Sequence, residues 1–222
     1  MTIKAVLLDS GGVLIQPRGG RWNPRFDFEE VVLRHAPHLT DEDLSRGIAA
    51  GQAFLDTAPA TVEFHDMHPV ILTEIGVPLT PELLEELRRP LDFHLVVEVF
   101  DDVVPTLQAL RDRGIRLAVV SDAGRDLDKA HAELGFGHYF DAYAISQVVG
   151  ACKPDPRMYR TASNALGLAP EECFFVDDWA DLVAAAIDLG YQGANLLRDS
   201  SAEPIAEVPV IRSLTEVLGW VS

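Results

Sequence analysis

The sequence has few cysteines, a shortage of basic residues and no long apolar run. Its two cysteines, Cys152 and Cys173, are far apart and form neither a metal-binding nor a redox spacing, which favours reduced thiols. No stretch approaches the roughly 20 apolar residues of a membrane span. The apolar run in MTIKAVLLDSGG is too short for a secretory signal and is typical of a core strand. We therefore expect a cytoplasmic protein that does not span a membrane.

Positive charge is scarce, because 18 Lys and Arg face 35 Asp and Glu and leave a formal net charge of −17. Binding to nucleic acid or to an anionic membrane needs basic residues that neutralise phosphates, so neither partner is expected. An anionic small-molecule substrate would be repelled by the overall field. Its site would need a bound cation or a local group of Arg and Lys.

The apolar pattern predicts a Rossmann-like α/β domain built from residues 1–15 and 100–222. Continuous apolar runs, which are typical of strands buried on both faces, occur at 3–8, 115–120, 173–176 and 193–197, with a weaker one at 142–146. Helical patterns are expected at 101–113, 125–134, 155–166 and 181–189. Strands that alternate with helices indicate a parallel sheet with helices on both faces.

Residues 16–99 break this alternation and predict an inserted α-helical domain. The helices are expected at 26–36, 41–56, 62–75, 81–88 and 92–99. Thr40 and Thr80 are suited to capping two of them, and Pro81 fits a first helical turn.

Polar residues stand at the ends of three predicted strands: Asp9, Ser121 and the pair Asp177-Asp178. Ligands of open α/β sheets bind beyond the carboxyl ends of the strands. Adjacent carboxylates repel each other unless a cation is bound or one is protonated. Oxygen-only ligands favour Mg²⁺. The sequence thus predicts a Mg²⁺ site at this edge of the sheet.

Four segments, in order, resemble the four motifs of the haloacid dehalogenase superfamily. They are VLLDSGGVL at 6–14, VVS at 119–121, GACKPDP at 150–156 and FFVDD at 174–178. The resemblance covers residues 5–197 and implies a Rossmann-like core with an α-helical C1-type cap. It implies that Asp9 is a nucleophile forming an aspartyl-phosphate, that the Ser121 hydroxyl donates to phosphate, and that Lys153 holds Asp9 and the phosphate. The implied Mg²⁺ ligands are Asp9, the carbonyl of Gly11, Asp177 and Asp178.

Further substrate contacts are expected from the same loops and from the start of the cap. Ser10, Gly12 and Asp122 adjoin the motif residues, although a carboxylate at Asp122 repels phosphate and suits a substrate hydroxyl better. Arg18, Arg21 and Trp22 follow the nucleophile loop and would attract and stack a small phosphorylated substrate; a solvated linker is the alternative. Glu63, His65, Asp66 and His68 have the residue types of a metal cluster but also fit an ordinary helix surface.

Gly11 departs from the pattern, because most phosphatases of the family carry a second Asp two residues after the nucleophile. General acid–base help is worth ~10²–10⁴-fold, so its loss slows turnover without forbidding it. Three readings remain: another group serves, the leaving group needs little help, or the protein is a weak or inactive relative. A dehalogenase is a further alternative, since dehalogenases also lack this Asp. They are metal-independent and do not usually carry Asp-Asp, so Asp177-Asp178 favours a phosphatase.

Overall fold

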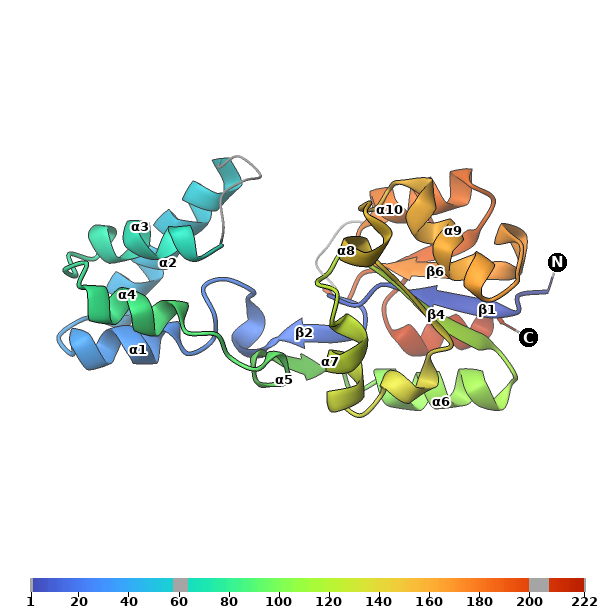
Figure 1. The fold of residues 1–222 in the computed structure, drawn as a ribbon, viewed down its shortest axis with the longest axis horizontal. Coiled ribbons are helices and arrows are strands. Elements are labelled where there is room, and N and C mark those ends of the chain that lie inside the picture. Colours follow the sequence, from blue (N-terminus) through green and yellow to red (C-terminus); the bar gives the residue numbers. More distant parts are fainter. Residues whose placement is uncertain (1, 58–63, 200–207, 222) are drawn as a thin grey trace. The chain divides into compact units, whose positions relative to one another are not determined.

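The computed structural model describes residues 2–57, 64–199 and 208–221, which form two compact units (Figure 1). An α/β unit comprises Met1–Gln16 and Val99–Ser222, and a helical unit comprises Pro17–Glu98. The boundary falls within a two-stranded sheet formed by β2 (Ile15–Pro17) and β3 (Val97–Val99). In the part of the chain that the structure describes, every helix is too short or too polar to cross a membrane.

A six-stranded sheet in the order β5-β4-β1-β6-β7-β8 forms the centre of the α/β unit, and its neighbouring strands pair in parallel. The strands are β1 (Ala5–Leu8), β4 (Arg116–Ser121), β5 (Ala142–Ile145), β6 (Cys173–Asp177), β7 (Gln192–Leu196) and β8 (Val210–Ile211). Leu8 at the end of β1 lies in register with Val119 and Val176 on the flanking strands. The residues after these positions therefore emerge side by side. The predicted Rossmann-like parallel sheet is confirmed.

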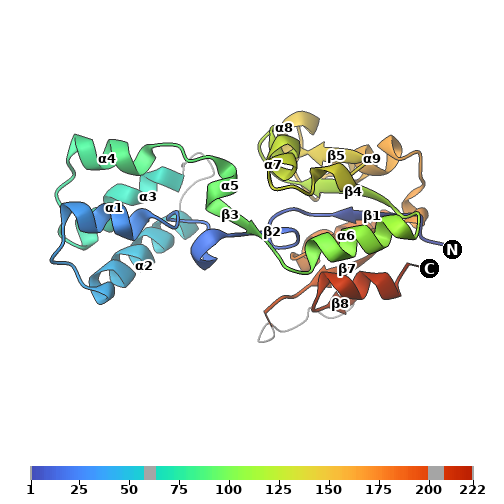
Figure 2. The ribbon, with the colours of Figure 1, turned by 90° about the horizontal axis from the view of Figure 1, so that it is seen from below.

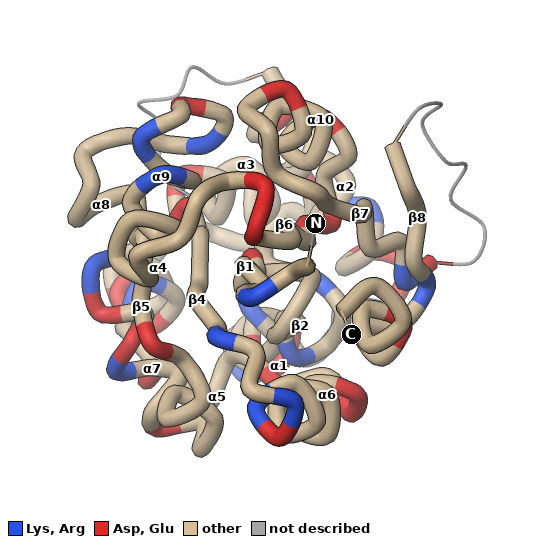
Figure 3. Tube along the Cα trace, turned by 90° about the vertical axis from the view of Figure 1, so that its right-hand side faces the viewer, with Lys and Arg blue, Asp and Glu red and all other residues tan. Residues whose placement is uncertain are grey.

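Helices cover both faces of this sheet (Figures 1 and 2). The helices are α6 (Val103–Asp112), α7 (Leu127–Glu133), α8 (Ser146–Val149), α9 (Pro156–Ala165), α10 (Ala180–Asp188) and the 3-10 segments η3 (Gly137–Tyr139), η4 (Pro170–Glu172) and η5 (Leu214–Gly219). Helices α9 and α10 lie on one face, and α6 and η5 lie on the other (Figure 1). On the α9 side, the Tyr159 ring packs edge-on against Phe175 with ring centroids 5.2 Å apart. Outer helices such as α6 and α7 carry charges of both signs (Figure 3).

The helical unit has a separate apolar core. Its elements are η1 (Arg18–Gly20), α1 (Phe28–His35), α2 (Asp41–Thr57), η2 (Phe64–Asp66), α3 (Met67–Glu74), α4 (Pro81–Arg88) and α5 (Phe93–Val96). Helices α2 and α3 pack closely because Gly47 and Gly51 lack side chains: a Cβ at these positions would lie 2.6 Å from Ile75 and 2.5 Å from Ile71. The expected caps form, since Thr80 accepts from the backbone N–H of Leu83 and Thr40 from that of Asp43.

Besides the short elements β2, α8, η1, η3, η4 and η5, which were not expected, three elements differ from the sequence-based expectation. The helix expected at 92–99 ends at Val96, and the chain continues as β3. Its β-branched valines are well suited to a strand, and here they find a partner in β2. The two-residue strand β8 was not expected. The helix expected at 62–75 is described only from Phe64, where it begins as η2; residues 62 and 63 lie outside the described residues.

Candidate functional site

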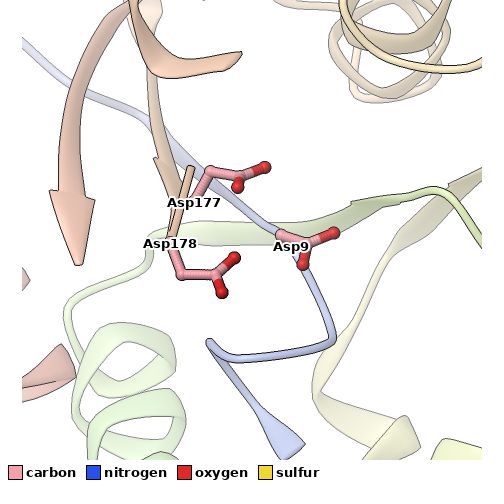
Figure 4. Close-up of side chains that lie close together, drawn as sticks. All are labelled: Asp9, Asp177 and Asp178. Carbon is pink, nitrogen blue, oxygen red and sulfur yellow. The ribbon is translucent and has the colours of Figure 1, made fainter. Parts of the chain in front are cut away.

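Three carboxylates converge at the carboxyl edge of the sheet (Figure 4). Asp9 directly follows β1, Asp177 ends the neighbouring strand β6, and Asp178 comes next. One oxygen from each lies within 4.8 Å of the others, so a single ion can contact all three. Asp9 is 7% exposed and Asp177 is fully buried. These are the carboxylates that the sequence predicted at the ends of the strands.

Lys153 lies between two of these carboxylates. Its Nζ is 2.7 Å from Asp9 Oδ1 and 2.6 Å from Asp177 Oδ2, and its side chain is 3% exposed. One ammonium against three carboxylates leaves two negative charges unbalanced when all groups are ionised. Buried unbalanced charge is costly. A divalent cation with a preference for oxygen ligands would restore neutrality, so this donor set fits Mg²⁺.

The protonation behaviour of the cluster follows from its crowding. Burial, and then the charge of Asp9, raise the pKa of Asp177 to about 7 and that of Asp178 to about 6. Burial lowers the pKa of Lys153, but the charges of Asp9 and Asp177 raise this pKa by more than burial lowers it. The pKa of Lys153 is therefore above its ordinary value. Lys153 is thus a permanent cation at neutral pH, whereas Asp177 and Asp178 take up protons at a higher pH than an ordinary Asp.

The loop after Asp9 passes directly over Asp178. Gly12 has a φ of +78°, and a Cβ there would lie 2.1 Å from Asp178 Oδ2. Glycine is required at this position both by the backbone conformation and by the space. Gly11 is not among the glycines with a positive φ, so its backbone is compatible with a side chain. A role for the Gly11 carbonyl in metal binding stays a prediction.

Ser121 and Asp122, at the end of β4, differ in exposure. Ser121 ends β4 next to β1 and is buried. Asp122 is exposed, and its Oδ1 accepts from the backbone N–H of Lys153 at 3.0 Å. This bond fixes the segment that carries Lys153, so Asp122 has a structural role that the sequence did not reveal. Its contact with substrate stays a prediction.

The side chain of Ser10 lies in the core rather than at an open surface. Ser10 is 2% exposed, and its Oγ is 2.9 Å from Nε2 of the fully buried His131. Nδ1 of His131 is 3.3 Å from the Tyr143 hydroxyl. Burial lowers the pKa of His131 to about 4, so a neutral ring connects the two hydroxyls at neutral pH. The Ser10 hydroxyl predicted to bind substrate is thus occupied by a residue that sequence analysis missed.

Arg198, which the sequence also did not indicate, holds the loop after Asp9. Its guanidinium donates to the carbonyls of Gly12 (3.2 Å) and Val13 (2.7 Å) and forms two 3.0 Å bonds to Asp102. It also lies 3.7 Å from the centroid of the Phe100 ring. Burial raises the pKa of Asp102, but hydrogen bonds from Arg198 and the backbone of Leu214 lower it more, so this pair stays ionised.

The residues after Gln16 that were predicted to contact substrate belong to the helical unit. Arg18 Nε donates to the Leu95 carbonyl at 3.0 Å, and Arg21 forms a 2.5 Å ion pair with Glu29. Trp22 is 49% exposed. The Arg21 charge is thus already balanced within the unit. Substrate contacts of Arg18, Arg21 and Trp22 stay predictions.

The His-rich segment of the helical unit does not form a metal cluster in the part of the chain that the structure describes. There, three ligand atoms close enough for one ion occur only at the Asp9, Asp177 and Asp178 set. His65 lies 3.7 Å from Asp66, and His68 is buried beneath the surface of the helical unit. Glu63 lies outside the described residues.

Comparison with known proteins assigns the family. A model of the haloacid dehalogenase-like hydrolase family matches residues 3–190, so the chain belongs to this family of hydrolases. It is 29% identical over 200 residues to Phosphatase MT3486 of Mycobacterium tuberculosis (strain CDC 1551 / Oshkosh), covering 84% of this chain and 83% of the relative. It is 27% identical over 190 residues to glyceraldehyde 3-phosphate phosphatase of Methanopyrus kandleri, covering 81% and 77%.

Solved structures support the same fold. The crystal structure of a HAD phosphatase from Thermococcus onnurineus is similar with a TM-score of 0.63 at 24% identity, covering 98% of this chain and 97% of that one. The L-2-haloacid dehalogenase from Xanthobacter autotrophicus is similar with a TM-score of 0.62 at 19% identity, covering 97% of both chains. At these identities the likeness establishes the fold and does not separate phosphatase from dehalogenase chemistry.

Proposed function

We propose that this hydrolase is a cytoplasmic, Mg²⁺-dependent phosphatase of a small phosphorylated metabolite, with Asp9 as nucleophile. The observation that carries the proposal is the charge of the strand-end cluster. Lys153 balances one of the three carboxylates, Asp9, Asp177 and Asp178, and leaves a deficit that matches one divalent cation. A metal-independent dehalogenase would leave this negative charge uncompensated.

The chemistry proceeds in two displacements at phosphorus. An Asp9 carboxylate oxygen bonds to phosphorus while the ester bond breaks and the leaving alkoxide takes a proton from solvent; water then attacks the aspartyl-phosphate and gives a proton back to solvent, releasing phosphate and restoring Asp9. Lys153, fixed 2.7 Å from Asp9, orients the nucleophile and balances charge. Ser121 donates to a phosphoryl oxygen. Mg²⁺ held by Asp9, the Gly11 carbonyl, Asp177 and Asp178 would neutralise the charge of the phosphoryl oxygens.

Protonation of the leaving group is the step for which this site has no assigned acid. Gly11 stands where the related phosphatases carry an acid, and general acid–base catalysis contributes ~10²–10⁴-fold. We propose that turnover is slow with poor leaving groups and faster with acidic alcohols or acyl phosphates. Gly11→Asp should raise the rate on alkyl phosphates by about tenfold or more and change little for the activated esters. No gain on either class would mean that another group already transfers the proton.

We further propose that residues 17–98 act as the cap that sets substrate choice, with Arg18, Arg21 and Trp22 as contacts. Arg18→Ala and Trp22→Ala should then raise KM more than they lower kcat, because they bind parts of the substrate remote from phosphorus. If both variants lowered kcat and left KM unchanged, this role in substrate binding would be wrong.

The test is phosphate release from a broad panel of phosphate esters with Mg²⁺ or with EDTA. Wild type should be active only with the metal, and Asp9→Asn should be inert because an amide cannot form the acyl phosphate. Asp188→Asn, an exposed carboxylate at the end of α10, is the matched control and should keep wild-type activity. If wild type were as inert as Asp9→Asn across the panel, the phosphatase assignment would fail. Metal-independent halide release from a 2-haloacid would replace it with a dehalogenase.

A further inference from the structure

The helical unit contains a basic cavity that the proposed reaction does not use. It has a volume of about 260 Å³, and its polar lining consists of Asn23, Arg25, His65, His68, Arg88 and Arg89. The described lining includes no carboxylate, although acidic residues outnumber basic ones almost two to one in the chain as a whole. The lining comes entirely from residues 23–96, so the cavity belongs to the helical unit alone.

The three arginines contribute differently to this cavity. Arg25 is held in place by a 2.5 Å ion pair with Asp27 and a 3.2 Å bond to the Glu86 carbonyl, and Asp27 balances its charge. Arg88 ends α4 and Arg89 follows it; both are exposed. Among the residues that the structure describes, neither has an ion-pair partner. Their two guanidinium groups therefore supply the positive charge of the cavity.

Carboxylates of α4 limit this charge without cancelling it at the cavity. Glu82, Glu85 and Glu86 line a separate depression together with Arg88 and Arg89. Glu86 forms ion pairs with Arg34 and His35, and its charge is thereby balanced. The remaining two glutamates do not line the basic cavity. Arg88 and Arg89 thus line both depressions, whereas the glutamates of α4 line only the one outside the basic cavity.

His68 adds a buried polar group to the lining. It is 6% exposed and packs on Phe28 with ring centroids 5.4 Å apart, and its Nδ1 has no hydrogen-bond partner in the described structure. Burial, followed by the charges of Arg25, His65 and Arg88, lowers the pKa of His68 to about 4. Burial disfavours any charge on this ring, whereas the positive charges of Arg25 and Arg88 also disfavour a cation near it and attract an anion.

We propose that this cavity binds a small tetrahedral oxyanion of the phosphate type, with Arg88 and Arg89 as its charged ligands. Guanidinium groups match such oxygens with paired N–H donors. Pockets for drug-sized molecules start at roughly 300 Å³, so a cavity of about 260 Å³ suits a small anion or one group of a larger molecule. The anion is either free orthophosphate or the phosphate of a metabolite. The lining shares no residue with the Asp9 cluster, and the proposal does not depend on the proposed function.

The experiment is a titration of the metal-free protein with sodium phosphate at neutral pH, observed through the NMR signals of the histidine rings. We expect saturable shifts of the His65 and His68 signals with a Kd of about 1 mM, and no saturable shift with chloride at equal ionic strength. The double variant Arg88→Gln/Arg89→Gln should weaken binding by about tenfold or more, since it removes both unbalanced charges. Arg46→Gln, an exposed arginine on α2 that does not line the cavity, is the matched control and should bind like wild type. Glycerol 3-phosphate and methyl phosphate distinguish a metabolite from the free ion: tighter binding than orthophosphate identifies the former.

Two results would overturn the proposal. One is the same linear shift with phosphate and chloride, which would indicate ionic strength alone. The other is unchanged phosphate affinity in Arg88→Gln/Arg89→Gln. Asp9→Asn separates this site from the proposed active site, because it should abolish turnover and leave the histidine shifts intact. Loss of those shifts in Asp9→Asn would place the anion at the Asp9 cluster and refute a separate site.

Discussion

Replacement of Gly12 by alanine tests the contact between this loop and Asp178, on which the proposed Mg²⁺ site depends. A non-glycine residue at φ +78° costs ~1–2 kcal/mol through the backbone alone. The added Cβ would also lie 2.1 Å from Asp178 Oδ2 and 2.5 Å from its Cγ. Carbon contacts are comfortable only at about 3.5 Å, so Asp178 or the loop must move by about 1 Å. Mg²⁺ tolerates little departure from octahedral geometry. The displacement should therefore weaken Mg²⁺ binding by about tenfold or more.

Gly114→Ala is a matched control for the backbone effect. Gly114 has a φ of +75°, and an added Cβ there would meet no atom within 4 Å. Both variants should lose stability to urea through the backbone, but Gly12→Ala should lose more, and only Gly12→Ala should lose Mg²⁺ affinity in calorimetric titration. In the background of Asp178→Ala, the extra destabilisation by Gly12→Ala should become much smaller, because only the 3.2 Å contact with the Cβ of residue 178 remains. Wild-type Mg²⁺ affinity in Gly12→Ala would show that the loop does not depend on this contact.

Three further predictions follow from the same unit. Arg198→Lys keeps the charge but loses the paired donors to Asp102 and the loop carbonyls, and should lower the free energy of unfolding in urea by ~1–3 kcal/mol; no change would mean that the loop holds itself. His131→Phe keeps the ring but leaves the hydroxyls of Ser10 and Tyr143 without this partner, at a similar cost of ~1–3 kcal/mol in the same assay, and an unchanged midpoint would refute the bridge. Because the pKa of Asp177 is raised to about 7 when folded, the metal-free protein binds an extra proton relative to the unfolded chain between about pH 4 and pH 7, so its stability should fall as pH rises through that range. The increase in Tm on adding Mg²⁺ should therefore grow with pH, and an equal increase at about pH 5 and pH 8 would contradict the assignment.

The parts of the site that the sequence predicted share one physical property. A strand buried on both faces is a continuous apolar run, so its end is marked wherever the run meets a polar residue. Asp9 and Asp177 are such residues on neighbouring strands. Parallel pairing then brings their side chains to one edge without further information. Position along a strand was therefore sufficient to find the cluster.

Arg198 and His131 could not be found in this way, because their contacts depend on how distant segments pack. Arg198 reaches Gly12 across 186 positions of sequence, and His131 reaches Ser10 across 121. Neither residue ends a strand, and each has the residue type of an ordinary helix or loop surface. The helix expected at 92–99 was wrong for a related reason: whether Val97 and Val99 continue a helix or pair as β3 depends on β2, which lies about 80 residues away in the sequence.

The structure also changes where attraction for an anionic substrate must originate. A net charge of −17 repels phosphate esters, and the sequence favoured Arg18 and Arg21 as the remedy. Arg21 is paired with Glu29, and Lys153 is shared between Asp9 and Asp177, so neither offers an unbalanced charge. At the Asp9 cluster the balance is negative until a cation is bound. Under the proposed function, a bound divalent cation would therefore supply the attraction for the phosphoryl group at this cluster, and Arg18, which donates to the neutral Leu95 carbonyl, would be the remaining predicted contact.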